Sequence, residues 1–192
     1  GKAVRNYVTS RGMEPENWRK YHLGYSPDRW AWLLEQARGT RFGPKLLETV
    51  GLVGQRRSGH GHYDRFKGRV LFSIRDPQGR PVALGGRILP GSTDAQAAKY
   101  VNSPETPLFS KSSLLYGLDH AKDALGKTRT ALVMEGYTDC LIASQYGFDN
   151  ALAVLGTALG ERHIKLLRRF VDRIVLVLDG DEALVVHLGM SG

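Results

Sequence analysis

Residues 130–139 read TALVMEGYTD, and residues 173–181 read RIVLVLDGD. Each stretch is an apolar run of strand length that ends in acidic residues. Such runs are typical of buried parallel strands, and open α/β sheets bind ligands beyond the carboxyl ends of their strands. The two stretches therefore predict a group of carboxylates at one edge of a sheet. These carboxylates belong to Glu135, Asp139, Asp179 and Asp181.

The region around these stretches alternates between strand and helix. We expect strands at 130–134, 151–154 and 173–178, and helices at 138–147 and 160–170. Alternation of this kind predicts a parallel sheet with helices on its faces.

The acidic residues have both a structural and a metal-binding interpretation. Glu135 directly follows the first strand, and Asp139 lies one helical turn later on the same side. An acidic residue at a helix start is more often a cap or a dipole partner. Asp179 and Asp181 would face one side of an extended segment and repel each other unless a cation neutralises them, although a solvated turn is the alternative. Oxygen ligands favour Mg²⁺ or Mn²⁺ over zinc.

The sequence before the first acidic stretch follows another pattern. Residues 69–75 and 81–89 flank a turn at 76–79, which predicts an antiparallel hairpin. Short amphipathic helices are expected at 30–37 and 43–50.

These patterns divide the chain into two units. We expect an α+β unit over residues 1–118 and a parallel-sheet unit over residues 119–183, so the chain is of the α/β class.

Composition limits the possible functions. The net charge of +8 and the pI near 9.7 favour a polyanionic partner without proving one. The only cysteine, Cys140, excludes an intrachain disulfide and a cysteine-based zinc site, and core packing is its expected role. The sequence contains no run typical of a membrane span or signal peptide. Because Gly1 is not an initiator methionine, we expect a fragment.

The middle of the chain combines basic and aromatic side chains. Such a surface can hold phosphates and stack bases, although a solvated basic face over core aromatics is the alternative. The candidate nucleic-acid or nucleotide contacts are Arg65, Arg69, Arg75, Arg87, Lys99, Tyr100 and Lys111.

Taken together, these motifs resemble a known family. The strand followed by EGYTD at 135–139, VLGT at 154–157 and the strand followed by DGD at 179–181 resemble the TOPRIM domain. Bacterial DnaG-type primases, type IA and II topoisomerases and some nucleases share this domain. The run KYVNSPETPLF at 99–109 and its basic neighbours resemble the primase core specifically.

The resemblance to primases implies a two-metal nucleotidyl transferase. Glu135, Asp179 and Asp181 would be catalytic, and together with Asp139 they would hold Mg²⁺ or Mn²⁺. The groove for template and nucleotide beside the metal site would be lined by Arg87, Lys99, Tyr100, Asn102 and Lys111, which adds Asn102 to the candidate contacts. The implied partners are a single-stranded DNA template, NTPs and the RNA primer, with the replicative helicase recruited through a C-terminal domain absent here. The implied location is the bacterial cytoplasm, with no membrane and no zinc in this fragment.

The last nine residues depart from this resemblance. Residues 184–192, LVVHLGMSG, look like a strand and turn of the formamidopyrimidine-DNA glycosylase family instead. We interpret residue 184 as a junction and carry no glycosylase role onto this tail.

Two other functions remain open at this stage. The chain could be an inactive module that binds single-stranded DNA, in which case it would bind DNA but no metal. It could also be a TOPRIM nuclease, which would nick DNA rather than incorporate nucleotides.

Overall fold

The computed structural model describes residues 2–56, 59–92, 97–178 and 184–188. In chain order the helices are α1 (Lys2–Ser10), α2 (Pro15–Lys20), α3 (Trp32–Gln36), α4 (Pro44–Thr49), α5 (Leu118–Thr128), α6 (Tyr137–Gln145) and α7 (Glu161–Leu167). The strands are β1 (Gly24–Ser26), β2 (Val53–Gln55), β3 (His62–Asp64), β4 (Arg69–Arg75), β5 (Pro81–Ile88), β6 (Tyr100–Asn102), β7 (Thr130–Met134), β8 (Ala151–Ala153), β9 (Arg173–Val177) and β10 (Leu184–His187). The α/β fold class predicted from the sequence is confirmed.

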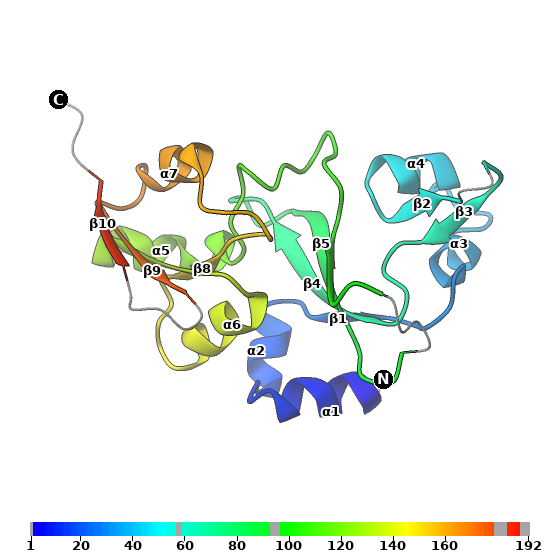
Figure 1. The fold of residues 1–192 in the computed structure, drawn as a ribbon, viewed down its shortest axis with the longest axis horizontal. Helices are drawn as coiled ribbons and strands as arrows, with labels where there is room; N and C mark the ends of the chain where they lie inside the picture. Colours follow the sequence, from blue (N-terminus) through cyan, green and yellow to red (C-terminus); the bar gives the residue numbers. More distant parts are fainter. Residues whose placement is uncertain (1, 57–58, 93–96, 179–183, 189–192) are drawn as a thin grey trace.

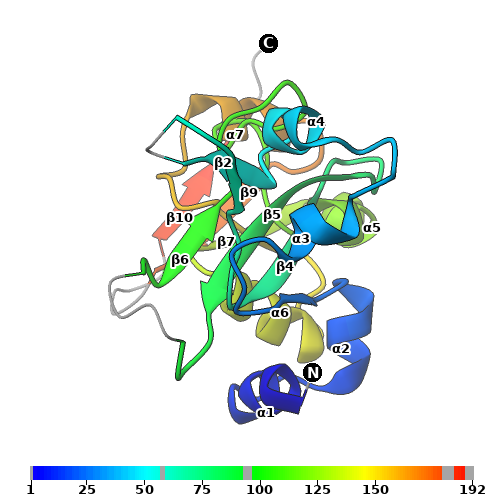
Figure 2. The same cartoon turned by 90° about the vertical axis from the view of Figure 1, so that its right-hand side faces the viewer.

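An antiparallel sheet with strand order β1-β4-β5-β6 lies at the centre of the molecule (Figure 1). The predicted hairpin is confirmed as β4 and β5. Its turn is held by Asp76, whose carboxylate accepts hydrogen bonds from the backbone N–H groups of Gln78 and Arg80 at 2.9 Å each. β6 forms the outer edge of this sheet beyond β5 (Figure 2).

The second sheet has the order β10-β9-β7-β8, and β7 pairs in parallel with both β8 and β9. The predicted parallel arrangement is therefore confirmed. The connection from β7 to β8 and the connection from β8 to β9 cross the sheet in opposite directions. Because such crossovers are right-handed, α6 lies on one face of the sheet and α7 on the other. The tail residues of β10 pair antiparallel with β9.

Two groups of buried side chains stabilise these sheets. The first joins the central sheet to α6 and β8, and it includes Phe72, Tyr116, Tyr137 and Cys140. The second fills the space between α5, α7 and the other face of the second sheet. Because the first group contains residues from both sides of residue 118, the two predicted units share one core. The division at that residue stays a prediction.

The N-terminal helices α1 and α2 are fastened to α6, far away in the sequence. The side-chain amide of Asn17 donates to the carbonyl oxygen of Leu141 at 2.6 Å. The side chain of Gln145 accepts from the backbone N–H of Glu14 and donates to the carbonyl of Gly12, both at 2.9 Å. These bonds attach the start of the chain to the helix that carries Asp139.

Within the described part of the chain, none of the helices combines the length and the apolar character needed to cross a bilayer.

Candidate metal and nucleic-acid site

The first acidic stretch lies where the sequence predicts it, at the carboxyl end of β7. Glu135 is exposed directly after the strand, and Asp139 is exposed in the first turn of α6. The Asp139 carboxylate folds back over Gly136, so a side chain at that position would collide with it. Neither acid forms an ion pair or hydrogen bond with another described residue, which leaves both carboxylates open to a cation.

Asp179 and Asp181 of the second acidic stretch lie outside the described residues. Leu178 is the last described residue before them. β9 runs parallel to β7 with Met134 beside Val177. Leu178, the residue before Asp179, lines a cavity of about 580 Å³ together with Glu135, Gly156 and Thr157. The chain therefore enters the second acidic stretch beside the first.

A second cavity lies at the same end of the sheet. It has a volume of about 590 Å³, is mostly apolar, and is lined by Asp139, Tyr146, Phe148 and Leu178. Among residues 2–56, 59–92, 97–178 and 184–188, no three acidic, histidine or cysteine side chains form a group that could hold a metal. The predicted four-carboxylate metal site thus stays a prediction, with two of its members described.

Next to the acidic site, Cys140 is fully buried, as core packing requires. Burial, with a smaller contribution from the negative charge of Asp139, raises the pKa of the Cys140 thiol. The thiol therefore stays neutral and serves as packing.

Four of the predicted nucleic-acid contacts lie together on β5, on β6 and directly before β6. Arg87 faces Tyr100 across the two strands, and its guanidinium lies 5.5 Å from the centre of that ring and 4.8 Å from the ring of Tyr7. Lys99 is exposed directly before β6, and Asn102 ends it. The Nε of Arg87 is buried without a hydrogen-bond partner among the described residues.

Arg69 has a different environment from the one predicted. Its side chain is buried, and its guanidinium donates to the carbonyl of Ala98 at 2.8 Å, of Gly86 at 3.2 Å and of Lys99 at 3.4 Å. These bonds tie the segment before β6 to β4 and β5. Arg69 is therefore reassigned from a groove contact to a support for Lys99.

Arg75 lies at the opposite end of β4, roughly 20 Å along the strand from Arg69. It donates to the carbonyl of Gly79 and lies 3.5 Å from the carboxylate of Asp119. Arg75 thus holds the hairpin turn against α5 and does not join the basic residues of β5 and β6. Arg65 is half-buried, and its Nε has no hydrogen-bond partner among the described residues.

Two hydrogen bonds fix the backbone of Lys111. Its N–H donates to the carboxylate of Glu105 at 2.9 Å. Its carbonyl oxygen lies 2.9 Å from Nε2 of His163, which is buried on α7. Nδ1 of that histidine accepts a hydrogen bond from the backbone N–H of Gly160 at 3.1 Å. Nε2 therefore carries the hydrogen and donates a hydrogen bond to the carbonyl oxygen of Lys111. The lysine side chain can therefore extend from a fixed loop.

The Glu105 bond predicts a pH dependence of stability. The N–H of Lys111 lowers the pKa of the Glu105 carboxyl below its usual value. A lowered folded-state pKa adds stability above the unfolded value, about 4.3 for glutamate, and that stability is lost as the pH falls through the folded pKa. We expect Glu105→Gln to lower the melting temperature near pH 7 by about 1–3 °C, as for an exposed charged bond. Melting curves from pH 3 to 7 should show this difference shrinking in acid; a constant difference would contradict it.

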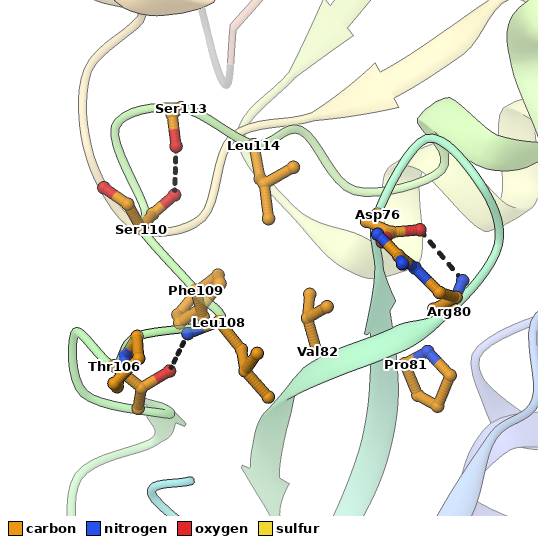
Figure 3. A pocket seen from close by; sticks show the side chains of 11 residues that line it. Asp76, Arg80, Pro81, Val82, Thr106, Leu108, Phe109, Ser110, Ser113 and Leu114 are labelled. Carbon is orange, nitrogen blue, oxygen red and sulfur yellow. Dashed lines mark hydrogen bonds and ion pairs between the residues drawn. The ribbon is translucent and has the colours of Figure 1, made fainter. Parts of the chain in front are cut away.

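A cavity of about 600 Å³ lies elsewhere, between the hairpin turn and the segment 106–114 (Figure 3). Asp76 and Arg80 form an ion pair of 2.6 Å on one side of it, and Leu108 and Phe109 lie on the other. It contains none of the predicted site residues, so it is separate from the acidic edge.

A contact that the sequence did not predict joins the acidic and basic parts. The hydroxyl of Tyr137, two residues after Glu135, donates to Oδ1 of Asn102 at 2.6 Å. Burial raises the pKa of the Tyr137 hydroxyl, which keeps it protonated as a donor. The EGYTD sequence contained this tyrosine, but nothing in the pattern indicated its partner on β6.

Comparisons with known proteins agree with this geometry. Residues 1–122 match the family described as DNA primase catalytic core, N-terminal domain. Residues 129–183 match the Toprim domain.

Curated relatives include two bacterial DNA primases. That of Synechococcus elongatus is 45% identical over 190 residues, covering 95% of this chain and 26% of that protein. That of Deinococcus radiodurans is 44% identical over 179 residues, covering 93% of this chain and 31% of that protein. The chain thus spans about a quarter to a third of the length of these relatives.

Solved structures with similar folds include primase domains. The RNA polymerase domain of Mycobacterium tuberculosis primase DnaG matches with a TM-score of 0.83 and 40% identity, covering 94% of this chain and 60% of that one. A DnaG primase catalytic domain bound to single-stranded DNA matches with a TM-score of 0.82 and 36% identity, covering 94% of this chain and 55% of that one.

Proposed function

We propose that this chain, which belongs to the family of DNA primase catalytic cores, supplies the polymerising centre of a bacterial primase. The reaction is the synthesis of a short RNA primer from NTPs on a single-stranded DNA template. The observation that carries the proposal is the Tyr137–Asn102 contact, because it joins an acidic strand end to a basic strand. For the whole protein, the replicative helicase is the proposed partner and the bacterial cytoplasm the proposed location.

The acidic side of the site suits divalent cations. Glu135 and Asp139 offer exposed carboxylates without competing partners among the described residues, and Asp179 and Asp181 follow Leu178 in the chain. Carboxylate oxygens are the ligands that Mg²⁺ and Mn²⁺ prefer. When bound, such ions would lower the pKa of the attacking hydroxyl and stabilise the negative charge on the leaving pyrophosphate. The protein's own task is to hold these carboxylates at one sheet edge.

The basic side suits a polynucleotide and a nucleotide. Arg87, held between the rings of Tyr7 and Tyr100, has a guanidinium ready for a phosphate, and the half-exposed Tyr100 ring can stack on a base. Lys99 and Lys111 add positive charge on backbone segments fixed by other residues. A similar DnaG primase catalytic domain was solved bound to single-stranded DNA, which supports single-stranded DNA as the ligand. We propose Arg65, Arg87, Lys99, Tyr100 and Lys111 as the contacts.

Calorimetry with Mn²⁺ and anisotropy with single-stranded DNA, both on this chain, test the two sides separately. We expect the chain to bind both. Four cationic contacts to a single strand predict a slope of log K against log salt of roughly −3, so that raising salt from 50 to 200 mM weakens binding by about 50-fold. DNA binding without Mn²⁺ binding would favour the inactive module instead.

Catalysis itself is tested on the full-length protein. Purified protein, single-stranded template, Mg²⁺ and labelled NTPs should yield short RNA. Nicking of the DNA without incorporation of ribonucleotides would favour a TOPRIM nuclease and contradict the proposal.

A further inference from the structure

One row of residues crosses the central sheet beneath the acidic site. Phe72 on β4 faces Gly85 on β5, and Gly85 faces Asn102 on β6. The next row on the same face is Val70, Arg87 and Tyr100. The two rows are adjacent because residues two apart on a strand share a face.

Tyr137 lies along the first row. Its ring stacks on Phe72 with 4.8 Å between centroids and 12° between planes. It then covers Gly85, where a Cβ atom would come within 2.6 Å of the ring. Its hydroxyl reaches Asn102 at the far strand. Only a residue without a side chain at position 85 lets the ring lie flat across the sheet.

Asn102, which accepts the hydrogen bond from Tyr137, also makes a second hydrogen bond. Its Nδ2 donates to the carbonyl oxygen of Leu155 at 2.8 Å, at the point where the chain leaves β8. The following Gly156 and Thr157 line the same cavity as Glu135. Asn102 therefore bonds to Tyr137, which begins α6 directly after the loop that follows β7, and to the loop after β8. Both loops begin at the carboxyl ends of neighbouring parallel strands.

We propose that Asn102 and Tyr137 are a positioning pair that fixes the acidic segment after β7 and the loop after β8 against the Arg87 and Tyr100 row. The inference rests on the proposed primase function. It replaces the direct nucleic-acid contact expected for Asn102, because the amide oxygen and an amide N–H of this side chain are both used within the protein. Asn102 acts on the reaction through Tyr137 and Leu155.

The variants that test this pair each remove a defined part of it. Tyr137→Phe removes the hydroxyl and keeps the ring stacked, Asn102→Ala removes both bonds, and the third variant combines the two changes. Tyr25→Phe and Asn6→Ala, which alter exposed side chains outside the site, are matched controls. Each change is made in the full-length protein, with circular dichroism to confirm folding.

Four quantities are measured for each variant: kcat and KM for ribonucleotide incorporation, Kd for single-stranded DNA, and Kd for Mn²⁺. We expect both single variants to lower kcat by about 5- to 100-fold, the range produced by small misplacements of reacting groups. KM and the Kd for DNA should stay unchanged, while Mn²⁺ should bind more weakly. The double variant should lose no more than the worse single variant, since both break the same connection.

Other outcomes would overturn the pair. If Asn102→Ala weakens DNA binding and Tyr137→Phe does not, Asn102 is a nucleic-acid contact. Additive losses in the double variant, or an unchanged kcat and Mn²⁺ affinity in both single variants, would also refute it. If the unaltered protein incorporates no ribonucleotide, the primase proposal fails by itself. The Mn²⁺ affinities of the four proteins still decide whether Asn102 and Tyr137 are coupled.

Discussion

Glu135→Gln is expected to reduce primer synthesis by the full-length protein by roughly a thousandfold, since metal stabilisation of transition-state charge contributes several kcal/mol. The substitution keeps the size and hydrogen-bonding capacity of the side chain and removes its negative charge. Glu135 is exposed and unpaired among the described residues, so the loss should leave folding intact. Initial rates of labelled-nucleotide incorporation at saturating Mg²⁺ measure the effect, and the Kd for single-stranded DNA should not increase.

The matched control for this experiment is Glu16→Gln. Glu16 is exposed at the start of α2 and lines neither cavity at the acidic edge. The Glu16→Gln variant loses the same negative charge and should retain full activity. Retained activity in Glu135→Gln would remove this residue from the catalytic group, and equal loss in both variants would indicate a general effect of charge.

Much of the fold could be predicted because its strands carry strong local signals. The five-residue apolar run from Thr130 to Met134 became β7 with the expected bounds, and the turn at Asp76 follows from side-chain bonds to its own backbone. The attachment of α2 to α6 could not be predicted. It depends on a bond from Asn17 to a backbone carbonyl 124 residues away, and every residue type offers such a carbonyl.

The candidate site shows the same division between local and long-range information. The acidic residue after β7 was predictable because it directly follows a strand. The sequence could not distinguish the roles of the basic residues. Arg69 and Arg87 both follow the same pattern, but in the structure the guanidinium of Arg69 bonds to carbonyl groups and that of Arg87 lies between aromatic rings. Asn102 belongs to a motif that suggests nucleic-acid binding, and only the folded chain brings Tyr137 to it.

Phe72→Ala is expected to destabilise the chain by about 3–5 kcal/mol, the usual cost of removing a fully buried phenylalanine. The side chain is 0% exposed, stacks on Tyr137 and meets the edge of Tyr116. For a chain of this length, each kcal/mol corresponds to about 2–4 °C in melting temperature, so a fall of roughly 6–20 °C is expected. Thermal unfolding followed by circular dichroism measures it, with Phe148→Ala as the control because that ring is 55% exposed.

The position of Phe72 makes a second consequence of this variant testable. Phe72 supports the Tyr137 ring from below, whereas Asn102 holds its hydroxyl, so a cavity at position 72 should loosen the tyrosine without touching either carboxylate. At a temperature well below the melting point of the variant, Mn²⁺ affinity should therefore fall even though the protein is folded. Phe72→Leu, which refills most of the volume, should recover stability more than it recovers Mn²⁺ affinity, because it cannot stack on the ring. Equal recovery of both would mean that packing volume alone, and not ring stacking, holds Tyr137 in place.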